Sequence, residues 1–111
     1  MKLPLEELLV VLTTVPEVET AQTLAETLVT EKLAACVQVL PAMTSTYCWQ
    51  GKLEVATEHL ILVKTLRTRY AQLEARLKAL HPYAEPEVVA LSATAVSASY
   101  LAWAMASLQL D

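Results

Sequence analysis

Two short, uninterrupted apolar runs constrain the fold of this chain more than any other feature. They are Leu8–Leu12 and Leu60–Val63. Each run is too short for a helix and is typical of a strand that is buried on both faces. A sheet with two such strands at its centre needs cover on both sides.

Helix-like segments separate the expected strands. Apolar residues at three- and four-residue spacing predict a helix over about Glu17–Lys32, and its start is marked by Pro16. A second helix is expected over about Thr68–Leu80, and a third helix should follow Ser97, which is a favourable N-cap residue. Between them, Val88–Leu91 suits a short strand.

The middle of the chain is predicted to form one long β-hairpin. Its arms are Ala34–Trp49 and Lys52–Leu66, and they are joined at Gln50 and Gly51, because glycine readily takes the positive φ of a two-residue turn. Pro41 has no N–H to donate, so the first arm should be an edge strand or bulged at that point.

The resulting order, βαββαβ with an extra C-terminal helix, predicts one α+β domain over residues 1–111. Two crossovers joined by a hairpin place Leu8–Leu12 and Leu60–Val63 at the centre of a four-stranded antiparallel sheet. Helices of about 22 Å cover one face only, and hairpin arms of nearly 50 Å reach beyond them. We therefore expect a symmetric assembly of several copies.

Composition excludes several classes of function. Gly51 is the only glycine, which rules out the Gly-rich phosphate loops of dinucleotide- and mononucleotide-binding folds. A formal net charge of −4 makes nucleic acid and anionic membranes unexpected partners. The run Leu8–Leu12 is too short for a signal or membrane segment. We therefore expect a cytoplasmic protein. Cys36 and Cys48 lack the spacing of a disulfide framework or zinc ribbon, so we expect them to be free thiols.

Few side chains stand out as chemical candidates. His81 precedes Pro82, where it is either a ligand or acid–base group or the end of a helix, and the second interpretation explains both residues. His59 is expected to be exposed. Cys36 lies in an apolar segment and is expected to be buried, whereas Cys48 should lie near the hairpin tip.

The basic residues allow two interpretations. Lys64 ends a buried run, so Glu85 or Glu87 is expected beside its ammonium group. Five of the eight basic residues, Lys64, Arg67, Arg69, Arg76 and Lys78, fall close together in the sequence. They form either an anion site or a solvated helix face. No nucleophilic set with an evident base is present, so an enzyme is not expected.

Several short motifs occur in an order that resembles the CutA divalent-cation tolerance proteins, over Leu8–Leu108. The motifs are Thr13-Thr14-Val15-Pro16, Glu31-Lys32-Leu33-Ala34-Ala35-Cys36-Val37, Thr44-Ser45-Thr46-Tyr47, Trp49-Gln50-Gly51-Lys52, Val63-Lys64-Thr65, His81-Pro82-Tyr83, Pro86-Glu87 and Tyr100-Leu101-Ala102-Trp103. The resemblance implies a ferredoxin-like two-layer sandwich assembled into a tight trimer like that of the PII signalling proteins. It also implies a cytoplasmic protein associated with tolerance to copper and other divalent metals.

The resemblance also bears on a copper site. Some CutA proteins have cysteine where this chain has Thr13, and a His-His pair where it has Leu80-His81, and those positions are implicated in copper binding. Only His81 remains here, and Glu87 or Glu85 could add a carboxylate. We therefore expect a weak metal site at His81 and Glu87, with no catalytic residues and no other cofactor. The alternative is a PII-like module that senses a small anion or partner at the subunit clefts through Lys64 and the basic helix face.

Overall fold

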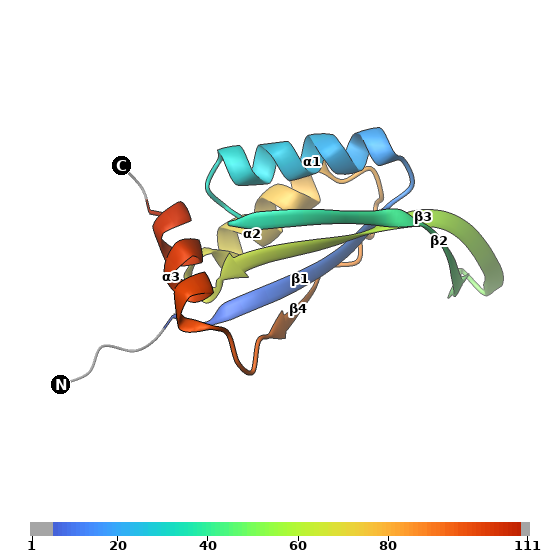
Figure 1. Cartoon of the computed structure of the whole chain (residues 1–111). Coiled ribbons are helices and arrows are strands. Elements are labelled where there is room, and N and C mark those ends of the chain that lie inside the picture. Colours follow the sequence, from blue (N-terminus) through green and yellow to red (C-terminus); the bar gives the residue numbers. More distant parts are fainter. Residues whose placement is uncertain (1–5, 110–111) are drawn as a thin grey trace.

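The computed structural model describes residues 6–109, and its centre is a four-stranded antiparallel sheet (Figure 1). In chain order the elements are β1 (Leu8–Val15), α1 (Val18–Thr30), β2 (Cys36–Trp49), β3 (Lys52–Leu66), α2 (Arg67–Leu80), β4 (Val89–Ser92) and α3 (Ala98–Ser107). The strands are arranged as β2-β3-β1-β4, so the two strands with continuous apolar runs are central, as predicted. The predicted α+β order is confirmed, although β1 continues beyond Leu12 to Val15.

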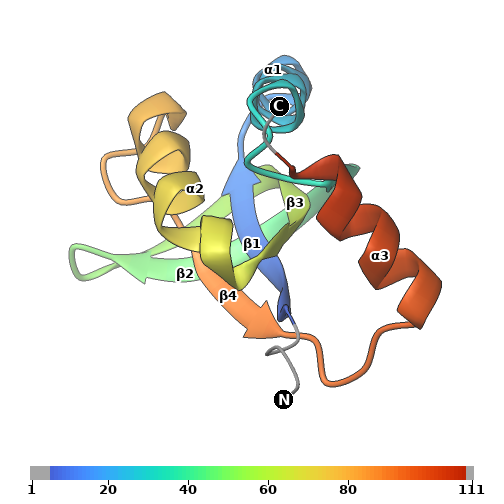
Figure 2. The ribbon, with the colours of Figure 1, turned by 90° about the vertical axis from the view of Figure 1, so that its left-hand side faces the viewer.

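The main core lies between one face of the sheet and the helices α1 and α2. Alternate residues of the central strands point toward these helices, and register pairs such as Val11 with Val63 and Thr13 with Ile61 place them side by side. This core contains Leu9, Val11, Val15, Ile61 and Val63 from the sheet, and Ala21, Leu24, Leu28, Leu73 and Leu77 from the helices. Figure 2 shows both helices on this side of the sheet.

The opposite sheet face is covered only in part. Ala104 of α3 and Leu108, which follows that helix, lie against Leu8 and Leu66 at one end of that face. Arg69 of α2 donates to the carbonyl oxygen of Leu108 and so ties α3 to the domain. We call the remainder of this face the open face, and its apolar residues are Val10, Leu12, Leu60, Leu62, Val89 and Leu91. Val89 and Leu91 are 46% and 51% exposed, and the other four are half-buried.

The β2–β3 hairpin extends well beyond the helices (Figure 1) and makes the molecule 54 Å long, against 26 and 23 Å in the other directions. Gln50 and Gly51 form the turn with φ of 52° and 79°, as the sequence predicts. The ladder is shifted between Val39 and Ala42, which confirms a bulge at Pro41 and the edge position of β2. Ser97 caps α3, as predicted, by accepting a hydrogen bond from the amide of Tyr100.

Two expectations about exposure are wrong. His59 is half-buried. The bulge takes Leu40 out of the β2–β3 ladder, so the Leu40 carbonyl oxygen can accept a hydrogen bond from Nδ1 of His59 at 2.9 Å. Cys36 is half-buried rather than buried, because it lies at an end of β2 on the open side of the sheet. Cys48 is exposed near the hairpin tip, as expected. No described helix has the length and hydropathy of a membrane span.

Candidate functional site

The imidazole of His81 joins the end of α2 to the end of β1. Its Nε2 lies 2.9 Å from the carbonyl oxygen of Thr14, and its Nδ1 accepts the backbone N–H of Tyr83 at 3.1 Å. A ring nitrogen that accepts an N–H carries no hydrogen, so the hydrogen of this neutral ring is on Nε2, which donates to Thr14. Both nitrogens of this buried side chain are therefore engaged.

The surroundings of His81 favour its neutral form. Burial lowers the pKa of the imidazole, and this effect exceeds the opposing effects of the Thr14 carbonyl and the Glu58 charge, which raise it. The neutral ring is the form that both hydrogen bonds require. His81 thereby holds the segment that begins at Pro82 against the sheet.

Tyr83 reaches from that segment to β3. Its hydroxyl donates to Oε2 of Glu58 at 2.7 Å, and its ring lies 5.0 Å from the ring of His81. Burial raises the pKa of the Tyr83 hydroxyl, and the hydrogen bond to Glu58 raises it further, so the phenol stays a donor. Glu58 itself is only 5% exposed, although the sequence suggests a solvated segment there.

A hollow of about 730 Å³ opens beside this pair, and we call it the acidic hollow. Its lining residues are Thr14, Ser45, Thr46, Tyr47, Trp49, Glu58, Pro82, Tyr83, Ala84, Glu85 and Glu87. Three of them are carboxylates and three are aromatic, whereas none of these described residues is Lys, Arg or His. The hairpin forms one wall, and the segment that follows α2 forms the other.

The structure separates the residues that the copper expectation grouped. Glu87 and Glu85 line the acidic hollow. Thr13 is fully buried on the helix side of the sheet, and Leu80 lines a different groove beside α1. Within residues 6–109, no three His, Cys, Asp or Glu side chains are grouped closely enough to hold a metal ion.

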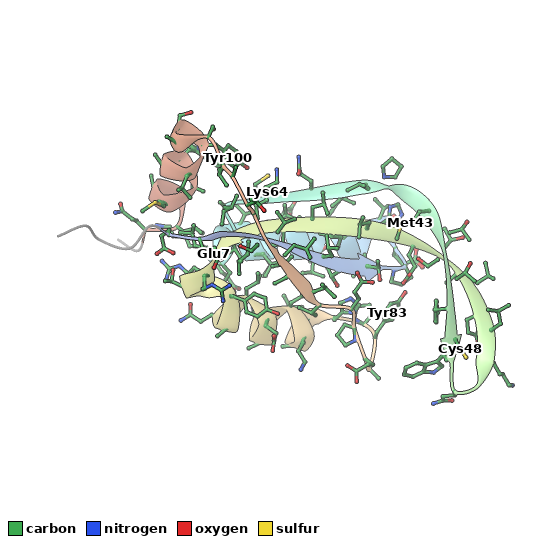
Figure 3. The ribbon with its side chains drawn as sticks, turned by 90° about the horizontal axis from the view of Figure 1, so that it is seen from below. Glu7, Met43, Cys48, Lys64, Tyr83 and Tyr100 are labelled. Carbon is green, nitrogen blue, oxygen red and sulfur yellow. The ribbon has the colours of Figure 1, made fainter. Side chains whose placement is uncertain are left out.

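The expected pairing of Lys64 with Glu85 or Glu87 is wrong. Its ammonium nitrogen lies 5.5 Å from the centre of the Tyr100 ring, at the end of the sheet that α3 covers. Figure 3 shows Lys64 and Tyr100 together and Tyr83 near the hairpin. The ammonium therefore faces an aromatic ring in place of a carboxylate.

Most of the basic helix face is engaged within the chain. Arg67 pairs with Glu7, and Arg76 donates to both carboxylate oxygens of Glu31 at 2.9 and 2.8 Å. Arg69 donates to the carbonyl oxygen at the end of α3. These contacts favour a structural role for the basic residues over an anion site.

Sequence reasoning missed Glu58 as a site residue. The available signal is the two-residue alternation of β3, which places Glu58 on the same face as Leu60 and Leu62. An acidic residue in line with apolar positions marks a carboxylate that is buried or paired. Its partner Tyr83 comes from another segment, so spacing along the chain does not reveal the pair.

Fold and hollow together define a class of protein: a small α+β domain with a split βαβ sheet, an overhanging hairpin and an acidic, aromatic hollow. Residues 9–107 match the family described as CutA1 divalent ion tolerance protein. The chain therefore belongs to the CutA1 family.

Individual relatives agree with this assignment. The divalent-cation tolerance protein CutA of Thermus thermophilus is 50% identical over 94 residues, which cover 85% of this chain and 91% of the relative. The protein of the same name from Citrobacter koseri is 45% identical over 103 residues, which cover 93% and 90%. The solved structure of CutA from Synechococcus elongatus is 38% identical and superposes with a TM-score of 0.89, covering 93% of this chain and 91% of the other.

Proposed function

We propose that this protein contributes to tolerance of divalent metal ions, copper among them, by binding them as a homotrimer without catalytic turnover. Membership of the CutA1 family supports a role in divalent-ion tolerance. The names of the family and of its relatives describe that tolerance and mention no chemical reaction. The observation that carries the binding proposal is the acidic hollow, where Glu58, Glu85 and Glu87 line one cavity that has no basic residue among its described lining. Carboxylate oxygens attract divalent cations.

Within this proposal, Glu87 supplies a carboxylate and His81 supplies an imidazole. The His81 ring binds a metal only by exchanging one of its two hydrogen bonds, because both ring nitrogens are engaged. That exchange costs free energy and lowers affinity. The proposed copper site is therefore weak. The two free cysteines support a cytoplasmic location, where thiols remain reduced.

The trimer is supported by the open face and the hairpin. Apolar side chains such as Leu91, at 51% exposure, form a contiguous surface that a second copy would remove from water. The hairpin tip also exposes Leu53 and Val55, at 75% and 64%. In a trimer of the kind that the CutA resemblance implies, neighbouring copies would cover both the open face and the hairpin tip.

Calorimetric titration with Cu²⁺, Zn²⁺ and Mn²⁺ tests metal binding, and sedimentation tests the trimer. We expect weak binding of Cu²⁺ that is reduced in Glu87→Gln and in His81→Gln. Glu26→Gln, which removes one exposed carboxylate from the outer side of α1, is the matched control and should bind as the unmodified protein does. Equal affinities in all four proteins would overturn the proposed ligands, and the absence of heat with every metal would overturn metal binding.

A further inference from the structure

The open face carries opposite charges at its two ends. Along β3, the side chains on this side of the sheet are Glu58, Leu60, Leu62 and Lys64. Glu58 lines the acidic hollow, whereas Lys64 lies at the end that α3 covers, and Figure 3 shows Lys64 and Tyr83 far apart along the sheet. Six residues of a strand span about 20 Å, so an apolar surface separates the carboxylate from the ammonium group.

Lys64 has no anionic partner in its own chain. Its ammonium group lies over the Tyr100 ring, and within residues 6–109 it forms no ion pair and donates no hydrogen bond. The ring engages one side of the ammonium group, which has three N–H donors. Lys64 is already half-buried in a single copy. An assembly that covers the open face removes more water from it, so an acceptor from another copy would offset that cost.

The acidic hollow carries the complementary charge. Its carboxylates are Glu58, Glu85 and Glu87, and none of its described lining residues is basic. Tyr83 gives Glu58 a hydrogen bond but no compensating charge. Glu87 is exposed, and Val89, two positions further on, continues the open face along β4. A copy that covers the open face at this end therefore gains from bringing a cation with it.

These charges match only when copies meet head to tail. The hollow end of one copy then lies against the α3 end of the next, and each interface brings one ammonium group to the carboxylates. Contact between two hollow ends would instead place like charges together, which is unfavourable. A head-to-tail contact closes when the rotation between copies completes a ring, so a trimer satisfies every copy.

We propose that the ammonium group of Lys64 enters the acidic hollow of the neighbouring copy and pairs there with Glu87, with the Glu58 charge behind it. The hollow is then an intersubunit site, complete only when Lys64 of the partner subunit occupies it. The inference rests on the proposed homotrimer and specifies its contacts. It does not depend on metal binding.

Charge reversal tests the pair, with sedimentation velocity over a dilution series as the readout. Lys64→Glu and Glu87→Lys should each raise the concentration at which the trimer dissociates by about tenfold or more, because like charges then face each other. The double variant restores the pair with its charges exchanged. Its dissociation should return to within about threefold of the unmodified protein. Circular dichroism establishes that each variant is folded.

Lys78→Glu is the matched control. Lys78 is exposed on α2, and its reversal changes the net charge exactly as Lys64→Glu does. It should leave the trimer unchanged, and it should not rescue Glu87→Lys. If Lys64→Glu fails to fold, Lys64→Gln carries the test. This variant removes the ammonium group without adding a carboxylate, so it should relieve part of the defect of Glu87→Lys.

A stable trimer in both single variants would overturn the ion pair and leave the proposed homotrimer standing. A double variant that is no better than the weaker single variant would do the same. A dimer in which the rescue still operates would support the pair and overturn the trimer. An unmodified protein that sediments as a monomer would overturn both.

Discussion

Nε2 of His81 donates to the carbonyl oxygen of Thr14 at 2.9 Å, although 67 positions separate the two residues in the chain. This hydrogen bond joins the residue that follows α2 to the end of a central strand. With the second bond, from the amide of Tyr83, it brings Tyr83 to Glu58. The histidine therefore organises one wall of the acidic hollow.

Loss of the His81 ring should destabilise the fold. His81→Ala leaves the Thr14 carbonyl and the Tyr83 amide without their partner, which should lower the free energy of unfolding by about 1–3 kcal/mol. Urea denaturation measures this change. His59→Ala, which removes the β3 histidine that bonds to the Leu40 carbonyl at the β2 bulge, is the comparison variant. Unchanged stability in His81→Ala would contradict the tie between α2 and β1.

The stability of the protein should depend on pH through His81. Its pKa is lowered in the fold, mainly by burial, so the unfolded chain binds a proton more readily than the folded chain does. Stability should therefore be greatest above the unfolded pKa of about 6.5 and should fall as pH drops below that value toward the folded pKa. Denaturation curves between pH 7.5 and 5.5 measure this slope. In His81→Gln the slope should become shallower; an identical slope would show that other groups cause it.

Two buried threonines on the helix side of the sheet should respond oppositely to valine. The hydroxyl of Thr65 donates to the Leu33 carbonyl at 2.7 Å, whereas the hydroxyl of Thr13 has no hydrogen-bond partner among the described residues. Thr65→Val should cost about 1 kcal/mol or more, and Thr13→Val should be neutral or stabilising. Thermal melts of both variants test the contrast. Equal destabilisation would mean that Thr13 has a hydrogen-bond partner.

Adjacent residues of β3 should separate folding from assembly. Ile61 is fully buried in the helix-side core, and Leu62 lies on the open face opposite Leu12. An aspartate at position 61 places a charge in the core and should unfold the chain. Leu62→Asp should instead yield a folded monomer, seen as an unchanged circular dichroism spectrum with a lower sedimentation coefficient. A trimer of Leu62→Asp would contradict the role of the open face in assembly.

The two cysteines should differ in their reaction with an alkylating reagent. Cys48 is exposed on the hairpin, and Cys36 is half-buried beside Lys64 in the β2–β3 register. Cys48 should be labelled first at neutral pH, and Cys36 more slowly. Mass spectrometry of timed samples, with Cys48→Ser as the single-thiol control, measures both rates. Faster labelling of Cys36 would contradict the placement of β2.

Local patterns in the sequence were enough to predict the order of elements, the two central strands, the turn at Gly51 and the bulge at Pro41. These features follow from local rules: hydrophobic periodicity, the positive φ that glycine permits, and the missing N–H of proline. Neighbouring residues carry all of that information. The CutA resemblance is likewise a matter of motif order along the chain.

The chemistry of the site depends on contacts that form only when the chain is folded. Tyr83 meets Glu58, Lys64 lies over Tyr100 in place of a carboxylate, and Thr13 lies in the core away from the hollow that Glu87 lines. Each of these relationships depends on a contact between segments far apart in the sequence. Strand register and helix packing set such contacts, and residue spacing does not contain them.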